Sequence, residues 1–126
     1  MNRVAPEAIA YSRNLTFDFS NTLRSESVNL NNYSDYTYII DVDGSVYQSA
    51  DANEDSASII LIGGIDGFAY EKMERIFTNF FITETQKVTL YKAIRELSKF
   101  YDSAKITSSN DKLEQSLNAL YSNYCG

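Results

Sequence analysis

The chain has 126 residues, of which 44% are hydrophobic and 22% are charged, and its formal net charge is −6. These values fit one folded domain with a real core, so we expect a single domain over residues 1–126. Residues 1–13 read as an N-terminal extension that holds at most a helical turn at Glu7 to Tyr11. An acidic domain without a basic stripe lacks the phosphate contacts of nucleic-acid binders, and the densest positive stretch, Lys87 to Lys99, is broken by Glu96. We therefore expect no nucleic-acid partner.

The first half of the chain predicts a strand and a hairpin. Asn14 to Phe19 alternates apolar and polar residues, a pattern typical of a half-buried strand. Residues 20–34 are polar and rich in Asn and Ser, which indicates a loop. Two β-rich runs, Tyr36 to Asp41 and Ser45 to Gln48, flank Asp43-Gly44. An Asp-Gly pair between such runs predicts a hairpin with a type I′ turn, which needs positive φ at both central residues.

The middle of the chain predicts a buried strand followed by a segment with two readings. Ser58 to Ile62 is a continuous apolar run that ends at Gly63-Gly64, which is typical of a central strand buried on both faces. Tyr70 to Phe80 fits either a helix or an ordered loop that carries aromatic residues. Thr83 to Gln86 then forms a capping box, in which the hydroxyl and the glutamine side chain satisfy free backbone donors at a helix start.

Two helices are expected in the last third of the chain. The first presents an apolar stripe at helical spacing, formed by Leu90, Ile94, Leu97 and Tyr101. After a short strand at Ala104 to Thr107, Asp111 and Glu114 can cap a second helix. Its stripe consists of Leu113, Leu117, Leu120 and Tyr124. This order predicts an α/β fold, a mixed β-sheet flanked by helices, with a right-handed crossover if the last two strands are parallel neighbours.

Four segments of the chain carry motifs of a known family. They are residues 15–22, 36–46, 58–66 and 81–86. The second, YTYIIDVDGSV, resembles the Y-H-[FY]-[VI]-I-x-x-D-G-T-V motif of type 2 N-acetylmuramoyl-L-alanine amidases, which include small phage endolysins and peptidoglycan recognition proteins. The third, SIILIGGID, is similar to the family's S-I-G-[IV]-x-L-[VI]-G-G-x-D motif with one residue fewer. The resemblance covers about residues 14–124 and implies the family's fold, with one family helix lost in residues 20–35 and the substrate groove opened or reshaped.

The resemblance also implies a zinc site, for which this chain lacks the ligands. Family enzymes hold one zinc ion with two histidines and a cysteine or aspartate, but this sequence contains no histidine. Asp18 and Ser109 stand at the histidine positions. Ser116 or Leu117 stands at the third, and Cys125 lies several residues beyond. Zinc lowers the pKa of bound water from about 15.7 to about 7, worth on the order of 12 kcal/mol, and no ordinary side chain replaces that effect. We therefore expect no metal, no cofactor and no catalysis.

Three residues are the candidates for what remains of the groove: Asp18, Tyr36 and Ser109. Tyr36 matches a tyrosine that assists the reaction in some family members. Without a metal or a nucleophile, we expect it to fill a wall of the groove. We expect Asp18 to face the groove and to form a hydrogen bond with Tyr36 or Ser109.

Other kinds of site have weaker support. The segment Asp51 to Asp55 imitates the start of a calcium-binding loop, but Ser56 stands where glycine is needed and Ile62 where the closing glutamate belongs. Serine hydrolysis lacks its histidine base. No motif indicates the paired carboxylates of a glycosidase.

The aromatic content favours an interaction surface. Ten Tyr and seven Phe exceed what two helix stripes and a sheet obviously need, and tyrosine is enriched at interface cores, although the same rings could equally fill the core. The candidate interface residues are Tyr33, Tyr38, Tyr70, Phe80, Phe81, Tyr121 and Tyr124.

The sequence thus predicts a non-catalytic, amidase-like binding protein of phage origin that acts through protein–protein contacts. It would be a virion or tail subunit, or a binder of a host or phage protein. No apolar run reaches the ~20 residues of a membrane helix and no signal peptide is evident, so we expect it in the host cytoplasm or the virion. Two alternatives stay open: peptidoglycan binding in the groove, and an unconventional cell-wall hydrolase around Asp18, Tyr36 and Ser109.

Overall fold

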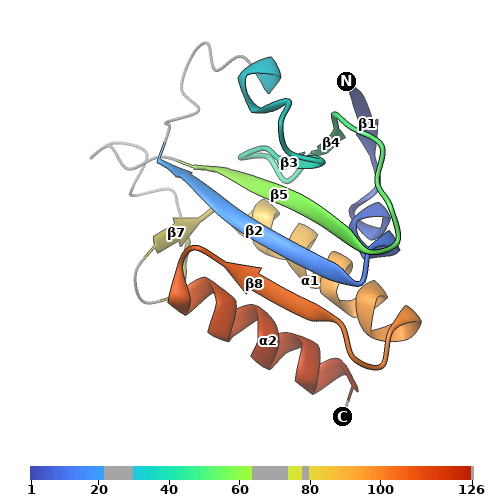
Figure 1. Ribbon diagram of the computed structural model, residues 1–126. Helices are drawn as coiled ribbons and strands as arrows, with labels where there is room; N and C mark the ends of the chain where they lie inside the picture. Colours follow the sequence, from blue (N-terminus) through green and yellow to red (C-terminus); the bar gives the residue numbers. More distant parts are fainter. Residues whose placement is uncertain (22–29, 64–73, 78–79, 126) are drawn as a thin grey trace.

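A six-stranded mixed sheet organises the chain, and two helices cover one of its faces (Figure 1). The computed structural model describes residues 1–21, 30–63, 74–77 and 80–125. In spatial order the sheet consists of β1 (Asn2–Val4), β4 (Val46–Gln48), β3 (Tyr38–Ile40), β5 (Ser56–Gly63), β2 (Asn14–Asn21) and β8 (Lys105–Ser108). The helical elements are the 3₁₀ turns η1 (Pro6–Tyr11) and η2 (Leu30–Tyr33) and the helices α1 (Glu84–Phe100) and α2 (Asp111–Cys125). The predicted α/β class is confirmed.

The centre of the sheet is parallel and its β1 side is antiparallel. β2 pairs in parallel with β5 and with β8, and β3 pairs in parallel with β5. β4 is antiparallel to both β3 and β1. A right-handed crossover was expected if the strands predicted before and after α1, β5 and β8, were parallel neighbours. They run parallel, but β2 lies between them, so the condition is not met.

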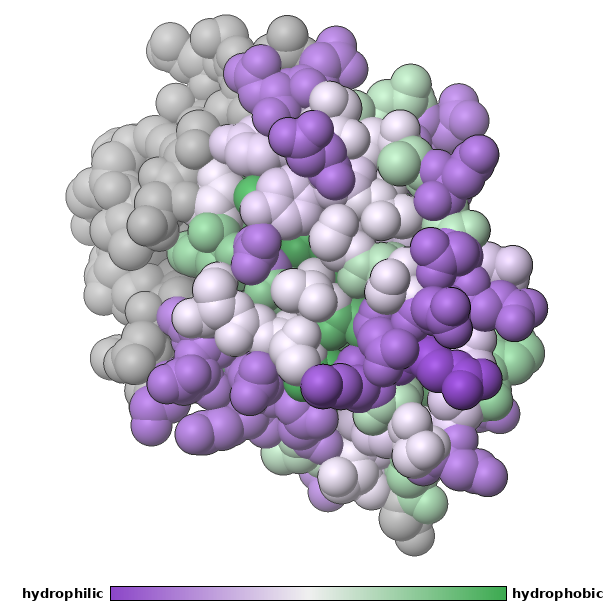
Figure 2. Space-filling view, viewed as in Figure 1, coloured by the Kyte–Doolittle hydropathy of each residue, from purple (hydrophilic) through white to green (hydrophobic). Residues whose placement is uncertain are grey.

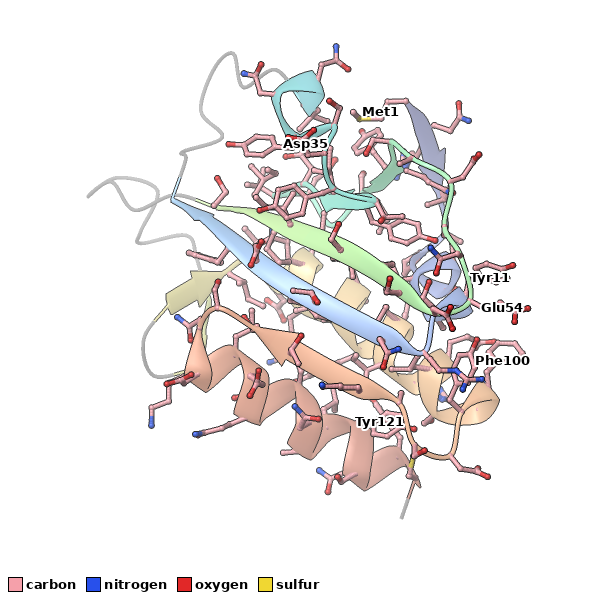
Figure 3. The ribbon with its side chains drawn as sticks, viewed as in Figure 1. Met1, Tyr11, Asp35, Glu54, Phe100 and Tyr121 are labelled. Atoms are coloured by element: carbon pink, nitrogen blue, oxygen red, sulfur yellow. The ribbon has the colours of Figure 1, made fainter. Side chains whose placement is uncertain are left out.

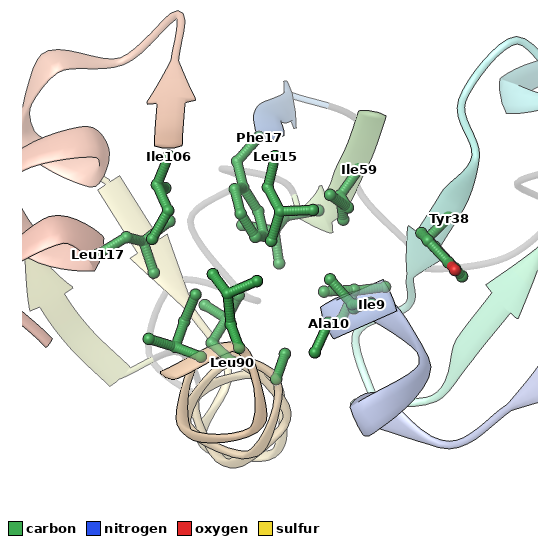
Figure 4. Close-up of a cluster of buried hydrophobic side chains, with 14 of the residues drawn as sticks. Ile9, Ala10, Leu15, Phe17, Tyr38, Ile59, Leu90, Ile106 and Leu117 are labelled. Atoms are coloured by element: carbon green, nitrogen blue, oxygen red, sulfur yellow. The ribbon is translucent and has the colours of Figure 1, made fainter. Parts of the chain in front are cut away.

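Strand alternation divides the apolar residues between the two faces. Leu15 and Phe17 of β2 point to the helix side, where they meet Ile59 of β5 and Leu90 of α1 in the main core (Figure 4). Ile39, Ile60 and Ile62 form a small second cluster on the opposite face. Because β5 supplies apolar residues to both clusters, it is buried on both faces, as its unbroken apolar run predicts.

The N-terminal segment, expected as an extension, contributes to both sheet and core. β1 pairs with β4 in a register that places Arg3 opposite Tyr47. η1 begins at Pro6, whose missing N–H is tolerated in a first helical turn. Ile9 and Ala10 of η1 are buried in the main core against the sheet and α1.

The β3–β4 hairpin lies where Asp43-Gly44 predicts it, but its turn differs from the predicted type. Gly44 has a φ of 84°, and none of the described residues other than glycine has a positive φ. Asp43 therefore does not adopt the conformation that a type I′ turn needs. The Gly44 N–H donates to the Asp41 carbonyl at 2.9 Å, and the Asp41 N–H donates to the Ser45 carbonyl at 2.9 Å. This pattern is typical of a type I turn followed by a glycine bulge.

The segment that follows β5 corrects another expectation. Glu74–Phe77 (β6) and Phe80–Ile82 (β7) form a separate two-stranded antiparallel sheet, whereas Tyr70 to Phe80 was expected as a helix or a loop. Residues 64–73 and 78–79 lie outside the described residues. β-branched and aromatic residues favour strands, and that preference prevails over the apolar spacing that suggested a helix.

The start of α1 is tied to the hairpin by side-chain hydrogen bonds. Thr83 is its N-cap, and the predicted capping box with Gln86 is present, with 3.1 Å in both directions. Gln86 is fully buried, and its Nε2 also donates to the carbonyls of Ile62 at 2.7 Å and Ile40 at 3.3 Å. Gln86 therefore joins the ends of β3 and β5 to the helix.

α2 begins one residue earlier than its acidic residues suggest. Oδ1 of Asn110, not a side chain of Asp111, accepts from the first free N–H groups of the helix. The apolar stripe runs through Leu113, Leu117 and Tyr121, while Tyr124 is exposed. A four-residue step from Leu117 keeps Tyr121, rather than Tyr124, on the face turned to the sheet.

Side chains of α2 cover the outer edge of β8. Nδ2 of Asn118 donates to the Ile106 carbonyl at 2.9 Å, and Oε1 of Glu114 accepts from the Ser108 N–H at 2.9 Å. Just before the strand, the Ala104 N–H donates to the Tyr121 hydroxyl at 3.0 Å. Two outward backbone groups of this edge are therefore paired within the chain. No helix in the described ranges is long and apolar enough to cross a membrane.

Candidate functional site

The side of the sheet opposite α1 and α2, which we call the open face, carries a band of hydroxyl groups and one carboxylate. These side chains come from β2, β5 and β8, from the chain before β3 and from the turn after β8: Thr16, Asp18, Tyr36, Thr37, Ser58, Thr107 and Ser109. Strand alternation places them there, since their neighbours point into the main core. Figure 2 shows this side as weakly hydrophilic atoms with hydrophobic spots, bordered by strongly hydrophilic side chains.

Asp18 is the centre of a hydrogen-bonded triad on the open face. The Tyr36 hydroxyl donates to Oδ2 of Asp18 at 2.7 Å, and the Ser109 hydroxyl donates to Oδ1 at 3.2 Å. β2 supplies the carboxylate, the chain before β3 supplies the phenol and the turn after β8 supplies the serine. The three predicted groove residues are thus brought together, and Asp18 bonds to both Tyr36 and Ser109, where one of the two bonds was expected.

The triad holds the Tyr36 phenol in its protonated form. The hydrogen bond to Asp18, burial and the negative charge of Asp18 raise the pKa of Tyr36 to about 12. Near neutral pH the side chain is therefore a phenol and not a phenolate. A general base needs a pKa near the working pH, so Tyr36 does not suit that role.

Tyrosines line one side of the triad. Tyr33, Tyr36 and Tyr47 are half-buried and pack on the second apolar cluster of Ile39, Ile60 and Ile62. The hydroxyls of Tyr33 and Ser20 lie 3.2 Å apart. The open face therefore joins an aromatic area to the hydroxyl band along β2, β5 and β8.

The residues at the implied zinc positions do not fit a zinc ion. Zinc sites in proteins use imidazole, thiolate and carboxylate ligands, and Asp18 has only serine and tyrosine hydroxyls beside it. Leu117, one of the two third-ligand candidates, is fully buried in the main core, and Ser116 is half-buried on α2. Cys125 is exposed near the end of α2. Across the described ranges, no three residues among His, Cys, Asp and Glu gather as a metal site would require.

The calcium-like segment has a structural role instead. Oδ1 of Asn53 accepts from the N–H groups of Asp55 at 2.9 Å and Ser56 at 2.8 Å, and its carbonyl accepts from the Ser12 hydroxyl. These bonds shape the turn that enters β5.

The candidate interface tyrosines divide into buried and exposed ones. Tyr38 and Tyr121 were wrong as interface residues, since they are 1% and 7% exposed. The Tyr38 hydroxyl donates to the Ala8 carbonyl at 3.0 Å, so its ring is a core residue with a satisfied polar tip. Tyr33 is half-buried at the open face, and Tyr124 is 39% exposed. Tyr70 lies outside the described residues, and only the backbone of β7 is described for Phe80 and Phe81.

Several exposed residues of the open face and of other parts of the surface were not predicted from the sequence. The Thr16 and Thr107 hydroxyls lie 3.1 Å apart on paired strands. The signal was available, since polar residues at alternate positions of a strand face away from the core. Two exposed aromatic residues were also missed. Phe100 is 66% exposed and Tyr11 is 51% exposed, and both lie at the same end of the molecule in Figure 3.

Comparison with known proteins supports the fold. No family model matches the sequence, and no curated protein matches it. The structure is similar to that of an endolysin, the N-acetylmuramoyl-L-alanine amidase LysCS from Clostridium intestinale URNW, with a TM-score of 0.52 and 13% identity. The match covers 89% of this chain and 76% of that one. The chain therefore has an amidase-like α/β fold, on whose open face Asp18, Tyr36 and Ser109 form a hydrogen-bonded triad.

Proposed function

We propose that this protein is a non-catalytic, amidase-like binding protein that acts through protein–protein contacts. Its binding surface is the open face, and its role is that of a virion or tail subunit or of a binder of a host or phage protein. The observation that carries the proposal is the hydrogen bonding of Asp18, whose two carboxylate oxygens accept from the Tyr36 and Ser109 hydroxyls.

The chemistry of the triad supports a binding role over a hydrolytic one. Amide hydrolysis needs an activated water or a nucleophile with a base. Tyr36, with its pKa raised to about 12, stays protonated near neutral pH and so does not accept a proton. Ser109 has no imidazole partner, because the chain contains no histidine. The side chains around Asp18 do not fit zinc. The same hydrogen bonds fix the three side chains in position, and a surface that is ordered before binding loses less entropy when it binds.

The composition of the open face supports a protein partner. Tyrosine supplies a large contact area at low entropic cost, and serine and threonine hydroxyls adapt to varied hydrogen-bond partners. Tyr33, Tyr36 and Tyr47 lie beside the hydroxyl band and pack on a shared apolar cluster. A partner that covers both areas would bury aromatic surface on one side and meet hydroxyls along the strands on the other.

Peptidoglycan binding is the second candidate function. The fold resembles that of an N-acetylmuramoyl-L-alanine amidase, and the open face combines tyrosines, hydroxyls and a carboxylate, which suit both sugars and peptides. An unconventional cell-wall hydrolase has less support, because both oxygens of the Asp18 carboxylate already accept from Tyr36 and Ser109 and the residues around it do not fit zinc.

Two matched variants test the proposal. Thr16→Arg places a long charged side chain at the centre of the open face, where Thr16 is exposed. Ser103→Arg makes a similar change at an exposed position in the connection before β8. In pull-downs from native or infected cells, we expect wild type and Ser103→Arg to retain the same stoichiometric partner and Thr16→Arg to lose it.

Other outcomes separate the alternatives. If wild type sediments with insoluble peptidoglycan and Thr16→Arg stays in the supernatant, the peptidoglycan alternative replaces the protein partner. Stoichiometric bound zinc together with cleavage of amide bonds in peptidoglycan would overturn the non-catalytic proposal. A monodisperse monomer that captures no partner and no peptidoglycan would contradict both binding roles.

A further inference from the structure

Asp18 places a negative charge on the open face that no described cation balances. Its two oxygens accept from the neutral hydroxyls of Tyr36 and Ser109, and it forms no ion pair with any residue that the structure describes. The side chain is half-buried near the end of β2. Partial removal from water disfavours a charge that has no opposite charge beside it, so a cation that reaches Asp18 from outside is stabilised there.

The cations whose side chains the structure describes lie away from Asp18. Arg13 lies over the Tyr101 ring, 5.5 Å from its centre. Lys105 belongs to the same side of the sheet, but it pairs with Asn14, four residues before Asp18 on β2. At about 3.3 Å per residue this separation is about 13 Å, which exceeds the Debye length of about 8 Å at physiological salt. The others belong to β1, at the opposite margin of the sheet from β8, and to α1 and α2 on its other face (Figure 1).

A second carboxylate adds to the negative charge at this end of the open face. Asp35 is exposed and directly precedes Tyr36. The hydrogen bond to Asp18, burial and the charges of Asp18 and Asp35 raise the pKa of Tyr36 to about 12. Both carboxylates therefore lie close enough to act on one phenol, and among the described side chains the charge around that phenol is negative.

The groups around Asp18 suit a guanidinium better than an ammonium. A carboxylate has about four lone-pair sites, so the two hydroxyls leave acceptor capacity for two more donors. The rings of Tyr33 and Tyr36 are half-buried beside it. A guanidinium donates through a planar fork, stacks on aromatic rings and is less strongly hydrated than an ammonium. A single arginine can therefore bind to the carboxylate and cover a tyrosine ring at the same time.

We propose that the open face binds an arginine side chain of the partner protein, whose guanidinium donates to Asp18 and stacks on Tyr36. The inference rests on the proposed function, because it names the group that the partner presents to this surface. A sugar would meet Asp18 through its hydroxyls, so its binding would not require an opposite charge. The charge of the ligand is thus the property that a test has to vary.

Two peptides that differ in one group test the proposal on the wild-type protein. NMR spectra would follow the backbone amides during titration with Gly-Ser-Arg-Ser-Gly and with the same peptide carrying citrulline, which resembles arginine in shape but has no charge. We expect the arginine peptide to shift the amide signals of Asp18, Tyr36 and Ser109. It should bind about threefold more tightly than the citrulline peptide, the effect of one partly exposed ion pair. Added salt is expected to remove this preference.

Two matched variants assign the preference to one carboxylate. Asp18→Asn removes the charge and keeps an oxygen that can accept from a hydroxyl. Asp51→Asn makes the same change at an exposed position between β4 and β5. We expect the arginine preference to vanish in Asp18→Asn and to persist in Asp51→Asn. With a partner recovered in pull-downs, Asp18→Asn is expected to weaken binding at least about tenfold, because a guanidinium covered by the complex then lacks its carboxylate.

The outcomes separate this inference from the proposed function. Equal affinity for the two peptides, amide shifts only far from Asp18, or an undiminished preference in Asp18→Asn would each overturn the inference. A partner that is lost by Thr16→Arg but bound equally well by Asp18→Asn would overturn it too, and would leave the proposed function standing. If wild type captures no protein partner, the proposed function fails, and the inference that names the group presented by that partner fails with it.

Discussion

Gly44 is the position at which a single methyl group is expected to disturb the fold most directly. Its φ is 84°, a conformation that other residues rarely adopt, and it lies in the hairpin turn against the first turn of α1. A Cβ atom added there would come within 2.6 Å of the Thr85 carbonyl oxygen and within 2.9 Å of the Thr89 hydroxyl. The Thr89 hydroxyl also donates to the Gly44 carbonyl at 2.6 Å, so the two elements are in close contact through this residue.

Three effects set the size of the destabilisation for Gly44→Ala. The left-handed conformation costs a residue with a Cβ about 1–2 kcal/mol. A carbonyl in the helix backbone cannot rotate away as a side chain can, so the hairpin and the helix must separate. That movement weakens the hydrogen bond from Thr89, worth about 1 kcal/mol. We expect the free energy of unfolding to fall by about 2–4 kcal/mol, and Tm to fall by about 10 °C.

Urea and thermal denaturation, followed by far-ultraviolet circular dichroism, measure this effect, and a second variant identifies its cause. Asparagine tolerates a positive φ better than alanine does, but it carries the same Cβ. If the close approach to Thr85 dominates, Gly44→Asn is about as unstable as Gly44→Ala. Recovery of most of the stability by asparagine would refute the contact argument. A Gly44→Ala protein within about 0.5 kcal/mol of wild type would refute the reasoning as a whole.

Three further predictions concern polar groups that the fold buries or pairs. Gln86→Leu removes the donor that joins β3 and β5 to α1 and leaves buried carbonyls without a partner, so urea titration is expected to show a loss of about 2–4 kcal/mol. Tyr121→Phe removes the hydroxyl that the Ala104 N–H donates to, and the same titration is expected to show a loss of about 1–3 kcal/mol. Asp18→Asn is expected to lower the pKa of Tyr36 from about 12 towards its ordinary value, as an ultraviolet titration of the phenols would detect. Because folding raises this pKa, the contribution of Tyr36 to stability is fully present below pH 10 and is lost as the pH rises through 12.

Matched controls accompany these variants. Gln115→Leu and Tyr124→Phe make the same changes at exposed positions of α2 and are expected to leave stability within about 0.5 kcal/mol. Equal losses at the buried and exposed glutamines would contradict the role given to Gln86, and an unchanged Tyr121→Phe protein would contradict the role of its hydroxyl. For Asp18, the contradicting result is a phenol that still titrates near pH 12 in the asparagine variant.

Local sequence signals predicted elements more reliably than their arrangement. The alternation in β2 and the capping box before α1 depend on neighbouring residues, and both were confirmed. The position of β2 between β5 and β8 depends on pairing between residues far apart in the chain, which no local pattern encodes. The turn at Gly44 differs from the predicted type, and it lies against Thr85 and Thr89 of α1, a contact that the Asp-Gly pair alone does not encode.

The sequence predicted the residues of the candidate site better than it predicted their surroundings. Asp18, Tyr36 and Ser109 come from three separate segments, and the family resemblance placed them together before their contacts were known. The burial of Tyr38 and Tyr121 was not predictable from aromatic content, because a phenol whose hydroxyl finds a backbone partner is as suitable for the core as for an interface.

The pairing of the β8 edge within the chain also limits how copies of this molecule can join. Exposed strand edges are the usual route by which folded proteins polymerise. Here Asn118 and Glu114 already occupy outward backbone groups of β8, so the opposite margin, β1, is the one left for an intermolecular ladder in the six-stranded sheet. Two copies joined β1 to β1 about a twofold axis would use up both free margins. Such a ladder ends at a dimer and does not extend into a fibre.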